Sequence, residues 1–483
     1  MTVRSGTQYI AGLRDDREVW YGAERVNDVT AFPEFRGAID SIAMLYDLQH
    51  APEHRDVLVA QCDDFEGNVA RTFEMPRTLD QLRLKREAYI KFAEATCGMM
   101  GRSPDFLNAM VTALAAKREF FARLSPERAD AIVSYYRYIA ENDLFLTHAL
   151  LDPQLDKTRA RHEQSDPGIC LRITGRNAEG LILNGIKRIA TAAPFADELF
   201  VWPFPPTFRP GEEAYANVFA IPMRTKGLKT LCRPSFSHIG DSRDYPLAAR
   251  FDEMDTTLIF EDVVVPWDRV FLHEDIDLLN CMYRDTRMRE LTAHQTNARL
   301  EVKLGFLYAL LVRMAEAQGI EGRSDILELL GEAAVRVEVI RSTTRSAELQ
   351  ARVDEENGIR YPYLPALQAG RALGPVYYPE MVAMVRRLGG GGLVQLPTSM
   401  REFDSPLGGD LERSLRGAHM SGKEKAQLFK LAWDVCGSEF GSRHELYEMN
   451  YAGERSPLVA GIHREYPRKQ ACLDHFDNFM GAL

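Results

Sequence analysis

The chain has 483 residues, of which 45% are apolar and 27% are charged, and its formal net charge is −11. This composition is typical of a globular protein with several domains of roughly 100–200 residues, and the acidic balance argues against a binder of nucleic-acid phosphates. Seven cysteines stand singly, and no stretch reaches the ~20 uninterrupted apolar residues of a membrane helix. We therefore expect a cytoplasmic protein with free thiols, no secretory signal and no membrane span.

The first part of the chain is predicted to be helical. Apolar residues recur at helical spacing through 39–48, 79–99 and 105–124. A further helix is expected to begin at Ser125-Pro126, because serine caps helices and proline suits the first helical turn. We expect residues 1–150 to form an N-terminal helical domain.

The middle of the chain changes to short apolar or alternating runs separated by glycine, asparagine and proline. The runs lie at 170–174, 181–185, 218–222 and 257–260. Several short strands at this spacing favour a small β-barrel or sandwich, so we expect a middle β domain over 151–280.

The last part, 281–483, is predicted to be a helical bundle. Apolar residues step by four and three through 300–314 and again through 326–347, which is the period of helices packed at shallow angles. Ser421 and Glu424 form a capping box that predicts the start of another helix.

Motifs of several common enzyme classes are absent from the sequence. It contains no GxxxxGK[ST], HExxH or GxSxG. Four glycines at 389–392 follow an amphipathic helix instead of a strand, and Val394 replaces the third glycine of the dinucleotide fingerprint. We interpret them as a helix end with a close-packed turn. The histidines do not pair at metal spacing with Cys, Asp or Glu, so no metal site is expected.

Ordered motifs across most of the chain carry a family resemblance. They are SGTQYI at 5–10, GRSPD at 101–105, Thr147-His148, RFDEMD at 250–255, VPWDRVF at 265–271 and GSEFGSRHELYE at 437–448. With these motifs the chain, from about 5 to 455, resembles the 4-hydroxyphenylacetate 3-hydroxylase family. The resemblance implies an acyl-CoA dehydrogenase-like fold, α+β and mainly α, with an N-terminal helical domain, a middle β-barrel domain and a C-terminal helical bundle.

The resemblance also implies an activity. Family members are oxygenase components of two-component flavin monooxygenases, which use FADH2 and O2, through a C4a-hydroperoxyflavin, to hydroxylate a phenol ortho to its hydroxyl group. They take FADH2 from a separate NAD(P)H-dependent flavin reductase, which agrees with the lack of a recognisable Rossmann motif, and they are homotetramers or homodimers. The expected substrate is 4-hydroxyphenylacetate or a tyrosine-derived or halogenated phenol.

Two residues are expected to act on the phenol. Because a free phenol has a pKa near ~10, a site that activates the ring needs a fixed cation and a proton partner. The resemblance places Arg102 at the phenol oxygen and gives His148 the acid/base role, with a contact to the flavin. Without the family motif, Arg102 would be an exposed arginine at a helix start and His148 a hydrogen-bonded core residue.

Further residues are assigned to the flavin by the resemblance, several of them through backbone groups. They are His148, Ala149, Leu150, Gln154, Leu155, Asp156, Lys157, Thr191, Ser438, Glu439, Phe440, Gly441 and Arg443. Thr191 would hydrogen-bond the flavin and Arg443 the pyrophosphate. The alternatives are an ordinary strand-end hydroxyl and a helix interior flanked by glycine.

Three residues are expected to bind the rest of the substrate. Pro203 and Phe204 fall where the family binds the substrate tail, and Phe106 stands where the family commonly has a tyrosine that holds the phenol oxygen. None of these side chains donates a hydrogen bond, which points to a larger or less polar phenol. The alternative for Phe106 is simple packing between helices.

Other activities are compatible with this kind of fold. A 4-hydroxybutyryl-CoA dehydratase would hold an iron–sulfur cluster on cysteines in the helical domain, but Cys97 has Gly101 at the required spacing and the next cysteine is Cys170. An acyl-CoA dehydrogenase would retain oxidised FAD and act on a CoA thioester. A non-enzymatic scaffold would show no dependence on flavin.

Overall fold

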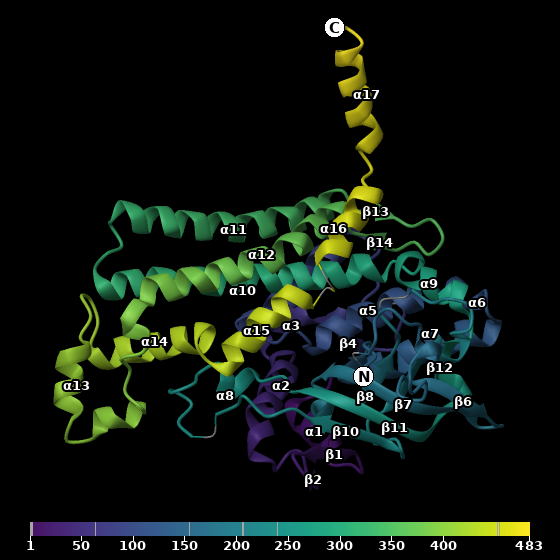
Figure 1. Cartoon of the computed structure of the whole chain (residues 1–483), viewed down its shortest axis with the longest axis horizontal. Coiled ribbons are helices and arrows are strands. Elements are labelled where there is room, and N and C mark those ends of the chain that lie inside the picture. Colours follow the sequence, from purple (N-terminus) through teal and green to yellow (C-terminus); the bar gives the residue numbers. More distant parts are fainter. Residues whose placement is uncertain are drawn as a thin grey trace.

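The computed structural model describes residues 3–62, 64–153, 155–204, 207–238, 240–451, 453 and 455–483. A helical layer, two β-sheets and a bundle of long helices follow one another along the chain (Figure 1). This is the mainly α architecture, with α+β organisation, that the sequence predicts.

Caps and prolines set the starts of the helices in the first layer. Thr78 forms a complete capping box for α4, and prolines stand first in α5 and α7. Ser125, predicted to cap α7, makes no side-chain cap hydrogen bond. The helix predicted at 105–124 divides at Lys117, whose backbone leaves the helical region. The helices are α1 (Gly6–Gly12), α2 (Arg36–Leu48), α3 (Pro52–Leu58), α4 (Leu79–Ala95), α5 (Pro104–Ala116), α6 (Arg118–Ala122) and α7 (Pro126–Glu141).

Two sheets form the middle of the molecule, and they contain all four predicted strands, as β6, β7, β9 and β11. The long antiparallel pair of β7 and β11 forms the centre of the larger sheet. Its order is β2 (Glu24–Val26), β1 (Glu18–Tyr21), β10 (Leu228–Cys232), β11 (Asp255–Pro266), β7 (Gly180–Thr191) and β6 (Arg172–Arg176). The smaller sheet has the order β12 (Val270–His273), β9 (Asn217–Pro222), β8 (Glu198–Val201) and β5 (Leu146–Ala149).

Strands from the first 150 residues complete both sheets. β1 pairs in parallel with β10, and β5 pairs in parallel with β8, where His148 lies opposite Phe200. Parallel partners need a long crossover connection, so this pairing carries no local sequence signal. A short hairpin of β3 (Val59–Gln61) and β4 (Asn68–Ala70) was also not predicted. The pairing of β5 places His148 where the helical layer meets the sheets.

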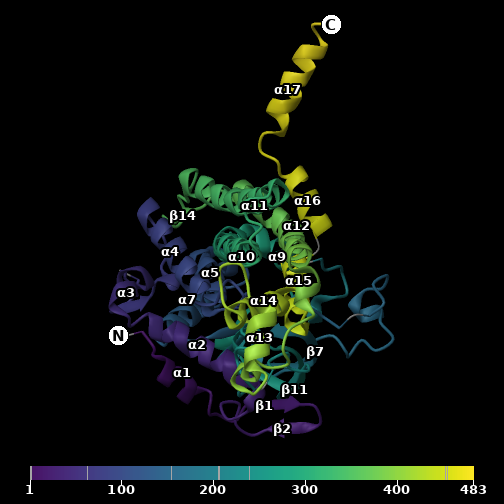
Figure 2. The ribbon, with the colours of Figure 1, turned by 90° about the vertical axis from the view of Figure 1, so that its left-hand side faces the viewer.

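The bundle confirms the predicted helical period. α10 (Met288–Gln318), α11 (Ser324–Leu349) and α12 (Leu364–Gly389) lie side by side (Figures 1 and 2), and α10 buries Leu300, Leu304, Leu307 and Leu311. Both bonds of the predicted capping box are present at Ser421, before α14 (Gly422–Cys436). The glycine run follows the end of α12, with Gly390 at a φ of +48°, as we interpreted it.

The remaining elements surround these long helices. They are α8 (Ala248–Phe251), α9 (Ile276–Asp285), β13 (Arg352–Val353), β14 (Arg360–Tyr361), α13 (Gly408–Leu415), α15 (Glu439–Asn450), α16 (Arg455–Arg464) and α17 (Lys469–Met480). α15 packs on α12 and α14 and brings the C-terminal motif back to the sheets, whereas α17 projects from the body (Figure 1). Within the described ranges, no helix is both long enough and apolar enough to cross a membrane.

Candidate active site

Arg102 lies in the turn before α5 and is buried, with 6% of its surface exposed. Its backbone N–H donates to Glu253 Oε1 at 2.6 Å, which fixes the turn against the start of β11. Its guanidinium carbon stands 4.2 Å from the centroid of the Phe106 ring, one turn further on. The expectation of an exposed arginine at a helix start, which applied without the family motif, is therefore wrong.

The guanidinium of Arg102 has neutral partners. Nη1 donates to the Tyr447 hydroxyl at 2.6 Å and to the Gly101 carbonyl at 3.2 Å, and Nη2 donates weakly to the Tyr451 carbonyl at 3.4 Å. Nε is buried and has no partner in the described part of the chain. No described carboxylate forms an ion pair with Arg102, although buried charges are normally paired. Among the described residues, the positive charge of Arg102 is therefore uncompensated.

His148 lies on β5, with 4% of its surface exposed. Its ring is 5.8 Å from the Phe106 ring, centroid to centroid, and 5.5 Å from the Trp202 ring. Burial is the main reason, and the charge of Arg102 the second, that the pKa of His148 lies well below the ordinary value of 6.5. The imidazole is therefore neutral at neutral pH and able to accept a proton.

Phe106 lies between Arg102 and His148. One side of its ring meets the guanidinium and its edge meets the imidazole. It also belongs to a core cluster of the helical layer, so it packs between elements as the alternative to a pocket role predicted.

Three buried nitrogens around Phe106 lack hydrogen-bond partners among the described residues: Arg102 Nε, His148 Nδ1 and Trp202 Nε1. Buried polar groups are nearly always satisfied in folded proteins, so each orphan atom calls for a ligand or a water. Trp202 directly follows β8 and was missed by the sequence reasoning, because a single aromatic residue at a strand end has no distinguishing pattern.

Thr191 connects this cluster to the larger sheet. Its hydroxyl donates to Asp255 Oδ1 at 2.8 Å, and its carbonyl accepts from the Thr147 hydroxyl, next to His148, at 2.6 Å. The lone pairs of the Thr191 hydroxyl therefore remain available to accept a hydrogen bond.

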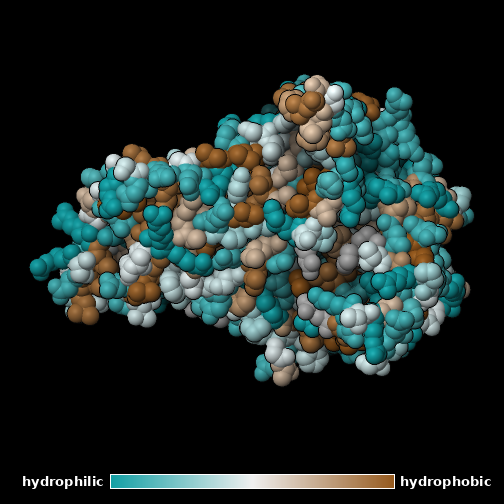
Figure 3. Space-filling model, turned by 45° about the horizontal axis from the view of Figure 1, so that its top comes forward, coloured by the Kyte–Doolittle hydropathy of each residue, from teal (hydrophilic) through white to brown (hydrophobic). Residues whose placement is uncertain are grey.

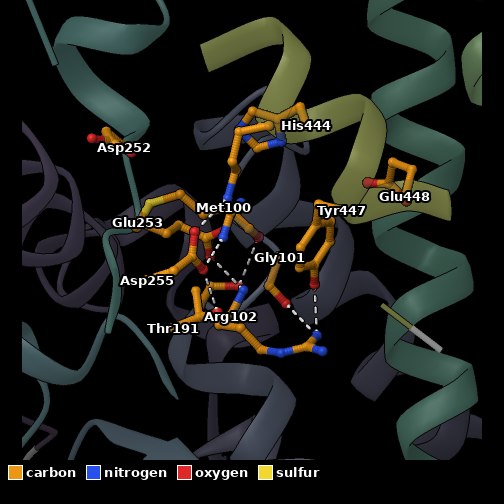
Figure 4. A network of polar contacts seen from close by, with 12 residues as sticks. Met100, Gly101, Arg102, Thr191, Asp252, Glu253, Asp255, His444, Tyr447 and Glu448 are labelled. Atoms are coloured by element: carbon orange, nitrogen blue, oxygen red, sulfur yellow. Dashed lines mark hydrogen bonds and ion pairs between the residues drawn. The ribbon is translucent and has the colours of Figure 1, made fainter. Parts of the chain in front are cut away.

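Arg443 forms the centre of an ion-pair network. It bonds both Asp255 oxygens, at 3.0 Å from Nε and 2.7 Å from Nη2, and its Nη1 bonds Glu253 Oε2 at 3.0 Å. Burial raises the pKa of Asp255, but Arg443 and Arg233 outweigh it and hold that pKa well below its usual range. Figure 4 shows Glu253 and Asp255 close to Arg102 and Thr191. The guanidinium expected to meet a pyrophosphate is thus occupied by two carboxylates.

An open cleft of about 750 Å³ lies beside this network. It is within the size range of ligand sites and combines charged side chains with aromatic ones. Its lining includes Ser438, Glu439 and Arg443 from the predicted flavin segment together with Phe236, Tyr245 and Trp433. Ser438 caps α15 by accepting from Gly441 N at 3.0 Å, and the helix N-terminus favours an anion. A Cβ at Gly441 would overlap the Val435 carbonyl, so the turn requires glycine. These features fit the polar half of FAD.

The remaining predicted residues lie at the edges of the site or away from it. Pro203 is buried, and half-buried Phe204 faces Tyr283 at 5.7 Å between ring centroids. Ala149 and Phe440 are buried, while Glu439 is exposed. The Leu150 carbonyl accepts from Phe204 N. Leu155 packs against the core cluster that contains Phe106, whereas Asp156 and Lys157 are exposed. Gln154 lies outside the described residues.

Comparison with known proteins identifies the arrangement. A model of the 4-hydroxyphenylacetate 3-hydroxylase N terminal matches residues 5–272, and a model of the C terminal matches residues 279–481. The chain belongs to the 4-hydroxyphenylacetate 3-hydroxylase family. It is 36% identical, over 96% of its length, to the oxygenase component of 4-hydroxyphenylacetate 3-monooxygenase from Thermus thermophilus, and it covers 95% of that relative.

Solved structures extend the likeness to the whole fold. A crystal structure of the oxygenase component of 4-hydroxyphenylacetate 3-monooxygenase with FAD has a TM-score of 0.94 at 36% identity, over 99% of this chain and 98% of that one. A complex with FAD and 4-hydroxyphenylacetate has the same TM-score and coverage at 35% identity. The protein is therefore an FAD-dependent phenol monooxygenase, the oxygenase component of a two-component system.

Relatives with other substrates in their names are nearly as similar. A 4-nitrophenol 2-monooxygenase oxygenase component from Rhodococcus is 32% identical over 94% of this chain and 87% of its own. A Streptomyces globisporus monooxygenase of a carrier-bound 3-chloro-4-hydroxyphenyl amino acid is 32% identical over 98% of this chain and 91% of its own. An archaeal 4-hydroxybutyryl-CoA dehydratase shares the fold, with a TM-score of 0.89, at 20% identity over 100% of this chain and 96% of its own.

A dehydratase of this fold would need a group of side chains that ligates an iron–sulfur cluster. In the described part of the chain, no three His, Cys, Asp or Glu side chains group as a metal site. Cys97 is partly buried, and burial raises the pKa of its thiol, which disfavours the thiolate form that ligates iron.

Proposed function

We propose that Arg102, His148 and Phe106 form the phenol site, and that the enzyme hydroxylates its substrate ortho to the phenol oxygen. The observation that carries this proposal is the buried guanidinium of Arg102, which no described carboxylate neutralises. A phenolate is an anion that would meet this charge, and its oxygen can accept from the orphan Nε of Arg102.

The two polar residues then have complementary tasks. Neutral His148 accepts the phenol proton, and the charge of Arg102 stabilises the oxygen anion that remains. The negative charge delocalises into the ring and makes the ortho carbon more nucleophilic. Reduced FAD with O2 supplies the oxygen atom, and the enclosing residues Phe106 and Trp202 exclude water from the ring.

The same proposal assigns the flavin to the space between this cluster and the open cleft. Thr191 would accept a hydrogen bond from a flavin N–H, and the N-terminus of α15 at Ser438 would face the phosphates. Arg443 would act by holding Asp255 and Glu253 in place and, through Glu253, the backbone of Arg102.

The substrate is proposed to be a substituted phenol less polar than 4-hydroxyphenylacetate. Phe106, Pro203 and Phe204 offer no hydrogen bond to a carboxylate tail, and Trp202 adds a further aromatic wall. Relatives of similar identity act, by their names, on a nitrophenol and a chlorophenol derivative. A halogenated or similarly substituted phenol, free or attached to a carrier, therefore suits the pocket best.

Two partners belong to the proposal. One is an NAD(P)H-dependent flavin reductase that delivers FADH2, because the sequence carries no recognisable nicotinamide motif. The other is the chain itself, assembled as a homotetramer or homodimer through exposed apolar helices such as α17.

Turnover of a phenol panel tests the proposal. The protein is mixed with FAD, NADH and each phenol, with and without an added flavin reductase, and catechol products are counted per NADH. We expect products only with the reductase, and more from halogenated phenols than from 4-hydroxyphenylacetate. Products from no phenol at all, or rapid NADH oxidation by the chain alone, would contradict it.

A further inference from the structure

Tyr447 places a second phenol group on Arg102. Its hydroxyl accepts the 2.6 Å hydrogen bond from Nη1, and its ring centroid lies 5.3 Å from the guanidinium carbon. Arg102 is therefore held between two aromatic rings, Phe106 from α5 and Tyr447 from α15. Figure 4 shows the Tyr447 ring directed down from α15 with its oxygen at the guanidinium.

The turn before α5 is shaped to admit this hydroxyl. A Cβ at Gly101 would overlap the Tyr447 oxygen and ring, so only glycine allows the contact as it stands. Position 101 precedes Arg102 directly, which means that the same turn presents the cation and makes room for its partner.

A buried ionic cluster fixes α15 at the next residue. Glu448 bonds Arg299 of α10 at 2.7 and 3.0 Å and Lys303 at 2.9 Å, and Lys303 also meets His444 Nδ1 at 3.1 Å. Glu448, Lys303 and His444 are 0% exposed and Arg299 is 1% exposed. Removing one partner of such a buried cluster is costly, so these contacts hold in place the part of α15 that carries Tyr447.

The Tyr447 hydroxyl has a proton that it donates to no described group. Burial raises the pKa of Tyr447 well above its ordinary value of 10, so the group stays protonated at working pH. Within the described ranges it accepts from Arg102 and donates to nothing. Arg102 Nε also lacks a partner there, so two donors of one hydrogen-bonded pair are free.

We propose that Tyr447 donates to the substrate's phenol oxygen from α15 and so supplies the hydrogen bond that Phe106 cannot supply from α5. This inference rests on the proposed phenol site at Arg102. It makes Tyr447 a specificity-determining residue, because the phenol oxygen is then held on the α15 side. The apolar ring of Phe106 is left to face a substituent ortho to that oxygen. Phenols with an apolar ortho group are the class that this arrangement selects.

Binding of 4-nitrophenol to the flavin-free protein tests the inference, because its phenolate absorbs visible light and reports the apparent pKa of the bound ligand. The wild type should bind the phenolate in preference to the neutral phenol. Tyr447→Phe should weaken phenolate binding by about tenfold, as expected for a lost hydrogen bond to a charged group, and should leave binding of the neutral form nearly unchanged.

Two control variants separate the possible outcomes. Tyr46→Phe removes a different buried tyrosine hydroxyl, on α2, which has no hydrogen-bond partner among the described residues, and should have no effect. Arg102→Gln should abolish the phenolate preference. If Arg102→Gln abolishes it but Tyr447→Phe behaves like Tyr46→Phe, the inference fails while the phenol site stands. If Arg102→Gln also has no effect, the phenol site itself is wrong.

Moving the phenol hydroxyl from α15 to α5 distinguishes a lost hydrogen bond from a variant that fails to fold. Phe106→Tyr in the Tyr447→Phe background returns a phenol group to the other side of Arg102 and should restore phenolate binding to within a few-fold, with melting temperatures followed for each variant. If the single variant loses phenolate binding and the folded double variant recovers none of it, the loss does not come from the missing hydroxyl and the inference is overturned.

Discussion

In the proposed mechanism, Arg102 and His148 act as a pair because the protein keeps one charged and the other neutral. Arginine remains protonated in any protein environment, whereas burial and the neighbouring cation hold the pKa of His148 well below 6.5. Phenolate formation at neutral pH needs a cation that stays charged and a base that is unprotonated before the phenol binds.

Replacing either member should uncouple flavin oxidation from hydroxylation. Arg102→Lys keeps a charge but loses the planar fork, and His148→Ala removes the base. Removal of one preorganised group typically costs about 10²-fold or more, so we expect product per FADH2 to fall steeply while hydrogen peroxide rises. Quantifying catechol and peroxide in the same reaction checks this. Full product yield in both variants would show that the residues are assigned wrongly.

The pH profile should reveal the neutral state of His148. Because its folded pKa is depressed, the base form persists as pH falls through the ordinary histidine pKa of ~6.5 and is lost only near the lower, folded value. We therefore expect kcat/KM for hydroxylation to hold constant from neutral pH to below ~6.5. An acidic limb centred at or above that pH would contradict the assignment of a buried, neutral His148.

The family pattern assigned Arg102, His148, Phe106 and Thr191 to one site, and the structure places them close to one another. Arg102 and His148 are 46 positions apart and meet because β5 pairs in parallel with β8, which local periodicity does not encode. The link from Tyr447 to Arg102 spans 345 positions and depends on how α15 packs, so no spacing rule predicts it.

At the scale of elements, α15 brings several residues of the proposed site together. It carries the cap residue Ser438, the network residue Arg443 and Tyr447 on one 12-residue helix. The starts of α14 and α7 follow sequence signals, as does the heptad-like period of α10. By contrast, β1 and β2 were not predicted, because strands of four and three residues carry too little pattern. The parallel partner of β1 also lies 211 positions away, Glu18 to Lys229.

Breaking the cluster beneath α15 should be costly. Glu448→Gln leaves Arg299 and Lys303 as buried cations without a counter-charge, and removing one partner of a buried pair costs about 3–5 kcal/mol. Denaturant unfolding should show that loss in the free energy of unfolding. Asp410→Asn, which removes an exposed partner of Arg413, is the matched control and should change it by less than about 1 kcal/mol. Equal effects of the two substitutions would show that the cluster does not hold α15.

For the whole molecule, the packing of α17 is unexplained, because this helix projects from the body of the single chain. Every residue from 455 to 483 is exposed or half-exposed, and brown side chains gather on the projecting end in Figure 3. The exposed apolar side chains are Leu473, Phe476, Phe479, Met480 and Leu483. An isolated helix of this length is marginal in water, so its stability requires packing against another surface.

Truncation tests whether that surface belongs to a second copy. A chain that ends at Tyr466 keeps the ion pair between Glu465 and Arg289 and should fold with an unchanged melting temperature at the monomer level, because the residues removed are all exposed. Its mass by light scattering should fall to a smaller assembly. A truncated protein of the same subunit number as the full chain would show that α17 has another partner.

The source of the oxygen atom tests the central claim most directly. Chemically reduced FAD is bound to the protein without oxygen and then mixed with 18O2 and a halogenated phenol, with no reductase or NADH present. The account predicts a catechol that carries one 18O atom and that forms in proportion to the FADH2 supplied. Absence of product with reduced FAD, or product whose new oxygen comes from water, would contradict it.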